Sequence, residues 1–135
     1  MRYTRIFGPA CLCLLFACKK NSPTAPVTTT TTQKNLVITA NCSVPCNIKV
    51  DTAHVNASTY NVFDLQGSFT GYSNSYNAIP GDAIEIFLNS NSVVNPGTMS
   101  FTAAYKGKVF LSASNTDAAF LGSSSFAEGK LVPNY

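Results

Sequence analysis

Alternation of apolar and polar residues in short runs is the feature that most limits how this chain folds. Between residues 98 and 105 every second residue is apolar, namely Met99, Phe101, Ala103 and Tyr105. Successive side chains of a β-strand point to opposite faces, so this spacing predicts a strand that buries one face. Ile84, Ile86 and Leu88 alternate in the same way, and we expect these apolar residues to form a core.

Runs of this kind recur from Asn35 onward and are separated by Gly, Pro, Asn and Ser residues. The composition favours strands over helices, because β-branched and aromatic residues are frequent while Glu, Lys and Leu are sparse. We therefore expect an all-β domain, a single Ig-like antiparallel β-sandwich of about seven to eight strands. The predicted strands cover residues 35–41, 46–52, 58–65, 68–78, 82–89, 98–105, 108–114 and 126–132.

Turn residues mark where the chain is expected to reverse. Lys106-Gly107 separates two predicted strands and has Gly at a position that tolerates positive φ, so these strands are expected to form a hairpin. Asn95-Pro96-Gly97 and Pro80-Gly81-Asp82 are predicted as further turns. Asp82 is best explained by this turn chemistry.

The N-terminal segment has a different pattern. Arg2 and Arg5 precede a short apolar stretch that ends at Lys19 and Lys20. The stretch is shorter than the ~20 residues that cross a bilayer, and its order of cationic and then apolar residues is typical of a secretory signal. Its last part, Leu15-Phe16-Ala17-Cys18, resembles the lipobox of bacterial, Bacteroidota-type lipoproteins. The alternatives are an ordinary signal peptide cleaved elsewhere and a cysteine that stands in an apolar segment by chance.

The lipobox resemblance implies that Cys18 becomes the first mature residue and carries acyl chains. Two acyl chains anchor a protein stably, since each buried methylene contributes ~0.8 kcal/mol. Lys19 is not the acidic residue that retains lipoproteins in the inner membrane, so we expect the outer membrane, in its periplasmic or its surface leaflet. The chain then divides into a signal peptide at 1–17, a Thr- and Pro-rich disordered tether at 18–34 and the β-domain at 35–135.

Cys42 and Cys46 remain in the mature domain. In an oxidising envelope compartment a disulfide is the default for such a pair. We expect the two residues to flank a tight hairpin between the first two strands, closed by a disulfide that stabilises the fold by roughly 2 kcal/mol. Reduced thiols are one alternative. A metal site would need further ligands, and a redox pair would prefer the Cys-X-X-Cys spacing.

The sequence favours neither an enzymatic nor a nucleic-acid-binding role. His54 is the only histidine, no Gly-X-Ser-X-Gly motif places a serine for it, and the acidic residues are scattered. The formal net charge is only +3, and no basic cluster accompanies it, whereas a nucleic-acid-binding face would need one. We therefore expect no catalytic residues, no cofactor and no metal.

Two further features are candidates for binding or modification. Phe69, Tyr72 and Tyr76 stand among Gly, Ser and Asn residues, a composition typical of contact surfaces. Tyr72 and Tyr76 share parity, so they emerge on one face of a strand, either as a binding surface for an envelope protein or a glycan or as the rim of an ordinary sheet. Asp51-Thr52-Ala53 resembles a Bacteroidota O-glycosylation acceptor, a pattern that is also frequent by chance, and makes Thr52 a candidate site.

The segments NAIPGDAIEIFLNSN (77–91) and GTMSFTAAYKGKVFLSAS (97–114) resemble the second half of the small β-sandwich domain in MmpS-like bacterial proteins. The resemblance implies a β-sandwich that accompanies a lipid-exporting transporter. Members of that family carry an N-terminal membrane helix, whereas the anchor expected here is a lipid. We therefore expect a membrane-anchored envelope lipoprotein that displays a binding or structural module, or alternatively an accessory subunit of an envelope transporter.

Overall fold

Residues 34–135 are described by the structure, a computed structural model, and they fold into antiparallel β-strands. No helix occurs among these residues. The prediction of an all-β domain is therefore confirmed. The strands are β1 (Leu36–Ala53), β2 (Asn61–Tyr76), β3 (Ala83–Ser90), β4 (Met99–Tyr105), β5 (Lys108–Ser114) and β6 (Ser125–Leu131).

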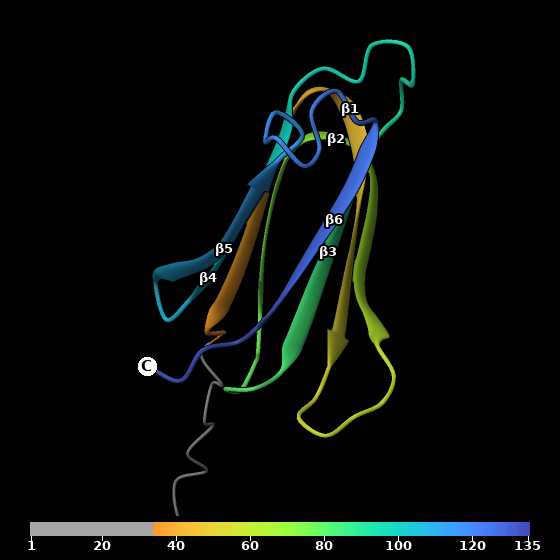
Figure 1. Ribbon diagram of the computed structural model, residues 1–135. Helices are drawn as coiled ribbons and strands as arrows, with labels where there is room; N and C mark the ends of the chain where they lie inside the picture. The colour runs from red at the N-terminus through yellow and green to blue at the C-terminus, as the bar shows by residue number, and fades with distance from the viewer. Residues whose placement is uncertain (1–33) are drawn as a thin grey trace, which may run out of the picture. The chain divides into compact units, whose positions relative to one another are not determined.

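The two longest strands, β1 and β2, run side by side and bend together (Figure 1). The first half of β1 pairs with β4, which in turn pairs with β5. The second half of β1 pairs with β3, which in turn pairs with β6. The sheet is therefore folded over at the bend, with one half of β1 and one half of β2 in each layer.

The core lies between the two layers. Phe101 of β4 stacks on Phe126 of β6 with ring centroids 5.4 Å apart, although these strands are not neighbours in the sheet. Alternate residues of β1, β3 and β4 fill the same space, as period-two burial requires. The largest fully buried apolar side chains are Phe101, Leu36, Ile38, Ile48, Ile84, Ile86, Leu88, Met99, Val50 and Val132.

Residues 34–135 form six strands rather than the seven to eight expected. The predicted strands 35–41 and 46–52 are two halves of β1, and 58–65 and 68–78 correspond to two halves of β2. The turn residues between these halves produce a bend instead of a strand end, because β1 and β2 remain paired with each other on both sides of it.

The hairpin predicted at Lys106-Gly107 is confirmed. Tyr105 of β4 pairs with Lys108 of β5, and the two residues between them have φ angles of 48° and 79°. Two consecutive positive φ angles match the turns that fit the twist of a two-residue hairpin.

The domain has two ends that matter for function (Figure 1). At one end, which we call the base, the chain enters at Lys34, and the 54–60 and 77–82 connections, the 106–107 turn and Tyr135 lie here. The base is held together by hydrogen bonds from the Asn35 amide to the Tyr76 carbonyl and from the Lys106 amide to the Asn35 carbonyl. At the opposite end, the tip, lie the bends of β1 and β2 and the connections 91–98 and 115–124.

Candidate functional site

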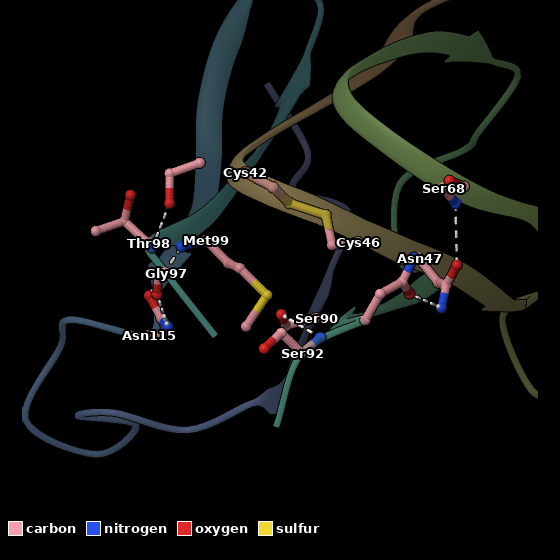
Figure 2. Close-up of a disulfide and its surroundings, with 12 residues drawn as sticks. Cys42, Cys46, Asn47, Ser68, Ser90, Ser92, Gly97, Thr98, Met99 and Asn115 are labelled. Atoms are coloured by element: carbon pink, nitrogen blue, oxygen red, sulfur yellow. Dashed lines mark hydrogen bonds between the residues drawn. A yellow bond between two sulfur atoms is a disulfide. The ribbon is translucent and has the colours of Figure 1, made fainter. Parts of the chain in front are cut away.

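A disulfide between Cys42 and Cys46 closes the bend of β1 at the tip (Figure 2). Their Cα atoms are 6.4 Å apart, whereas four residues of extended strand span about 13 Å. The pairing of these two cysteines agrees with the expectation, but the hairpin does not. The segments on either side of the bend do not pair with each other, because one pairs with β4 and the other with β3.

Ser43, within this bend, binds the 91–98 connection through both its backbone and its side chain. Its amide donates to the Thr98 carbonyl at 2.9 Å, and its Oγ accepts from the Thr98 amide at 2.9 Å. Gly97 lies against it with a φ of 64°, and a Cβ at Gly97 would collide with the Ser43 Oγ. Further along β1, Asn47 accepts from the Ser68 amide at the bend of β2 and donates to Asn91.

Asn115 ties the 91–98 connection to the 115–124 connection (Figure 2). Its side chain is only 2% exposed. The amide group donates to the carbonyls of Gly97 at 2.8 Å and Ser123 at 3.2 Å, and its oxygen accepts from the Met99 amide at 2.8 Å. Because every hydrogen of this amide is used in the interior, the two connections have a fixed position relative to the sheet.

Large apolar side chains are exposed on this fixed framework. Val94 is 94% exposed, and Val93 and Leu121 are also exposed. The 91–98 connection carries no charged residue, and in 115–124 the only one is Asp117, whose carboxylate accepts from the Ser114 amide. Single exposed apolar residues are common, but several on rigid, nearly uncharged connections at one end make the tip the candidate binding site.

Tyr72 and Tyr76, predicted as part of a binding surface, lie away from the tip in the second half of β2, whereas Phe69 lies at the bend of β2 opposite Cys46. Tyr72 pairs with Ala40 and Tyr76 with Leu36, and both partners point into the core. The two tyrosines therefore share a face, and it is the inward one, with Tyr76 buried and Tyr72 half-buried. Phe69 packs against the core, with its ring centroid 5.6 Å from that of Tyr72.

Both tyrosine hydroxyls meet the carboxylate of Asp64, which comes from the first half of β2. Tyr76 donates to Asp64 Oδ2 at 2.6 Å, Asn74 donates to the same oxygen at 2.9 Å, and Tyr72 also donates to it. Asp64 pairs with the core residue Val50 in the other layer. The cluster therefore links the two layers along the edge that β2 forms.

The charges of this cluster are fixed by its hydrogen bonds. Burial raises the pKa of Asp64, but hydrogen bonds from Tyr72, Tyr76 and Asn74 outweigh burial and bring the pKa to about 2. Burial, together with the hydrogen bond to Asp64, raises the pKa of Tyr72 to about 12 and raises that of Tyr76 as well. At neutral pH the carboxylate is ionised and accepts hydrogen bonds from two neutral phenols. The role of the cluster is therefore to stabilise the fold.

His54 and Asp82 form a second polar contact, at the base. Asp82 is 1% exposed, and its Oδ1 lies 3.2 Å from His54 Nδ1. The same carboxylate accepts from the amides of Val55 and Ile79, so it holds the 54–60 and 77–82 connections together. A cavity of about 240 Å³ lies beside it. No Ser, Thr or Cys is among the residues that line this cavity, which are Asn35, His54, Asn77, Ala78, Ile79 and Asp82.

The other predicted sites are placed as follows. Thr52 is 8% exposed and lies between Asn61 and Ile84 of the neighbouring strands. Cys18, the signal peptide and the tether up to residue 33 lie outside the described residues.

Residues 34–135 contain no group of three or more His, Cys, Asp or Glu side chains arranged to hold a metal ion. Within the same residues, no helix has the length and apolar character needed to span a membrane.

Comparison with known proteins gives no relative. The chain matches no protein-family model, no curated protein and no solved structure.

Two features of the site were not predicted from the sequence. Asn115 gives no local signal, because its partners Gly97 and Met99 are 18 and 16 residues away. Val93-Val94 does give a local signal. This apolar pair stands between Ser and Asn residues in a turn region, outside any predicted strand that could bury it.

Proposed function

We propose that this protein is a lipid-anchored cell-envelope lipoprotein whose β-domain presents its tip to another envelope component. The observation that carries the proposal is the arrangement of the two ends. The chain enters at the base through Lys34, while the fixed apolar tip with Val93, Val94 and Leu121 stands at the opposite end. An anchor on the N-terminal side would leave the tip free to meet a partner.

The anchor in this proposal is Cys18, acylated after cleavage of residues 1–17, and residues 18–34 are the tether. The Cys42–Cys46 disulfide supports a location outside the reducing cytoplasm. The membrane is the outer membrane, in either its periplasmic or its surface leaflet. The domain is an Ig-like β-sandwich in this proposal, because its antiparallel strands pack in two layers on one shared core.

The partner of the tip is an envelope protein rather than a glycan. Exposed valine and leucine side chains favour burial against another apolar protein surface. Glycan recognition would use polar groups and flat aromatic rings, and the aromatic residues Tyr72 and Tyr76 instead point inward onto Asp64. No catalytic activity is proposed.

The anchor is tested by fractionation and intact mass. The native protein should begin at Cys18, carry the mass of its acyl chains and remain with membranes after a carbonate wash. The Cys18→Ala variant should lose both properties. A variant that stays membrane-bound would contradict the lipid anchor.

The tip is tested by site-specific photo-crosslinking in intact cells. A crosslinker at Val94 should yield one adduct of defined mass, and the control position Val62, which is 59% exposed on β2, should yield none. Equal adducts at both positions, or none at Val94, would contradict a binding tip. An adduct with a large transporter would identify the protein as an accessory subunit.

A further inference from the structure

We infer that the base is a docking surface for anionic lipid, so that the domain stands on the membrane with its tip pointing away from it. The inference rests on the proposed function, because the lipid anchor keeps the base near the membrane. It adds a second contact between this protein and lipid, made by side chains of the folded domain.

Charge is concentrated at the base. Four of the five lysines in residues 34–135 lie at this end, namely Lys34, Lys106, Lys108 and Lys130, and all four are exposed. The acid among the connections here, Asp82, is buried and is occupied by His54 and two backbone amides. Glu85 is partly buried and lies within β3, where it pairs with Gly129 of β6. The base therefore presents a net positive surface, which complements an anionic one.

Apolar and aromatic side chains lie among these lysines. Five large apolar residues of the base are exposed, which are Val55, Tyr60, Ile79, Leu131 and Tyr135. Lysine, tyrosine and aliphatic side chains together are typical of surfaces that sit in the headgroup region of a bilayer. The tip has exposed aliphatic residues but no lysine. The base therefore suits an anionic lipid surface, and the tip suits an apolar protein surface.

The base also has a cavity between its lysines. A space of about 460 Å³ is lined by Lys34, Lys106, Asn35, Val37 and Gly107. It shares the lining residue Asn35 with the cavity beside His54 and Ile79, so the two cavities are neighbours at the base. The positive charges of Lys34 and Lys106 would attract a phosphate headgroup to this cavity.

Hydrogen bonds hold this surface in place before any lipid arrives. The Asn35 side chain donates to the Ala78 carbonyl and accepts from the Ala78 amide, both at 2.9 Å, which fixes the 77–82 connection against the start of the domain. Lys106 Nζ donates to the backbone oxygen of Tyr135 at 3.1 Å, and Lys108 Nζ lies 4.7 Å from the centre of the Tyr135 ring. Little ordering is therefore required on docking.

Because the tether keeps the domain near the membrane, a weak contact between the base and lipid is sufficient for docking. The residues between Cys18 and Lys34 reach at most about 55 Å when extended. An anchored domain is thus confined near its own membrane, and the second contact is intramolecular in effect. The base can leave and return without release of the protein.

The orientation is tested with single tryptophan residues, since the natural chain has none. Ile79→Trp reports from the base and Val94→Trp from the tip. Each acylated full-length variant is reconstituted into vesicles of phosphatidylethanolamine and phosphatidylglycerol in equal parts, with and without brominated lipid. We expect a blue shift and quenching for Ile79→Trp and neither for Val94→Trp.

Electrostatics is tested with charge variants in the Ile79→Trp background. Lys106→Asn with Lys108→Gln should reduce docking about fivefold for each lysine, and so should vesicles of phosphatidylcholine alone. Asn95→Asp with Ala119→Glu lowers the net charge by the same amount at the tip and should leave docking unchanged.

Each failure has a distinct signature. A protein that does not float with the vesicles lacks the proposed anchor. A protein that floats while Ile79→Trp is not quenched is anchored without docking, and this overturns the inference alone. Quenching of Val94→Trp equal to that of Ile79→Trp also overturns it. So does quenching of Ile79→Trp that is unchanged when Lys106 and Lys108 are replaced. A shift of Ile79→Trp only when native membrane proteins are included would assign the base to a protein partner instead.

Discussion

Phe101 and Phe126 stack with their ring centroids 5.4 Å apart, and they come from strands on opposite layers of one folded sheet. The contact exists because β1 and β2 bend at the tip and carry their pairing partners with them. Whatever holds the bend therefore also holds the two layers together. The Cys42–Cys46 disulfide and the hydrogen bonds of Ser43 and Asn115 act at this place.

Replacing Cys42 and Cys46 by Ser should lower the free energy of unfolding by about 2 kcal/mol, because the disulfide closes a loop of only a few residues. Chemical denaturation measures the change. Reduction of the natural protein is the control and should give a similar decrease. An unchanged denaturation midpoint would show that the bend is held by its hydrogen bonds alone.

Asn115→Ala should lower the free energy of unfolding by about 3 kcal/mol. The change leaves the buried Met99 amide and the carbonyls of Gly97 and Ser123 without their partner, and an unsatisfied buried group costs about 1–3 kcal/mol. Asn95→Ala, on the exposed 91–98 connection, is the matched control and should change stability by less than about 0.5 kcal/mol. Equal effects of both variants would refute the role given to Asn115.

Gly97→Ala should destabilise more than Gly107→Ala. Both glycines have positive φ angles, 64° and 79°, so the backbone strain of an alanine is similar at the two positions. Only at Gly97 does the new Cβ meet the Ser43 Oγ, while at Gly107 nothing lies within 4 Å. We expect a difference of about 1–3 kcal/mol between the two variants in thermal or chemical unfolding. No difference would mean that the 91–98 connection can move away from Ser43 at no cost.

Asp64 should make stability depend on pH in the acid range. Its pKa is lowered in the fold, from 3.8 to about 2, so its contribution is fully present above the unfolded value and is lost as the pH falls toward the folded one. Denaturation midpoints should fall through this window, and the fall should be smaller in Asp64→Asn. Carbon-detected NMR titration of the Asp64 carboxyl measures the pKa directly. A value near 3.8 would contradict the hydrogen bonds from Tyr72, Tyr76 and Asn74.

Much of the secondary structure could be predicted from the sequence. The alternation from Met99 to Tyr105 predicted β4, and Lys106-Gly107 predicted the turn to β5. Both predictions depend on residues that are neighbours in the chain. Such local preferences favour the same backbone conformation whatever the tertiary surroundings of the segment are. The pairing of Cys42 with Cys46 was predictable for the same reason, since only three residues separate them.

The candidate site could be predicted only in part. The shared face of Tyr72 and Tyr76 follows from their parity, but parity does not say which face is buried. The tyrosine side chains point inward because Tyr76 pairs with Leu36, a core residue 40 positions earlier in the chain. Asp64 then meets both hydroxyls because β2 folds over on itself.

Side-chain alternation and backbone φ preferences are local properties, so they predict from the sequence alone where strands form and where the chain turns. Two of the expected connections are instead bends inside β1 and β2, and this follows from the pairing of the two strands in the folded domain. The layer that each strand joins, and the gathering of lysines and apolar connections at opposite ends, also follow from the folded domain. These outcomes depend on the register between segments far apart in the chain, which is set by how the two layers pack on one core.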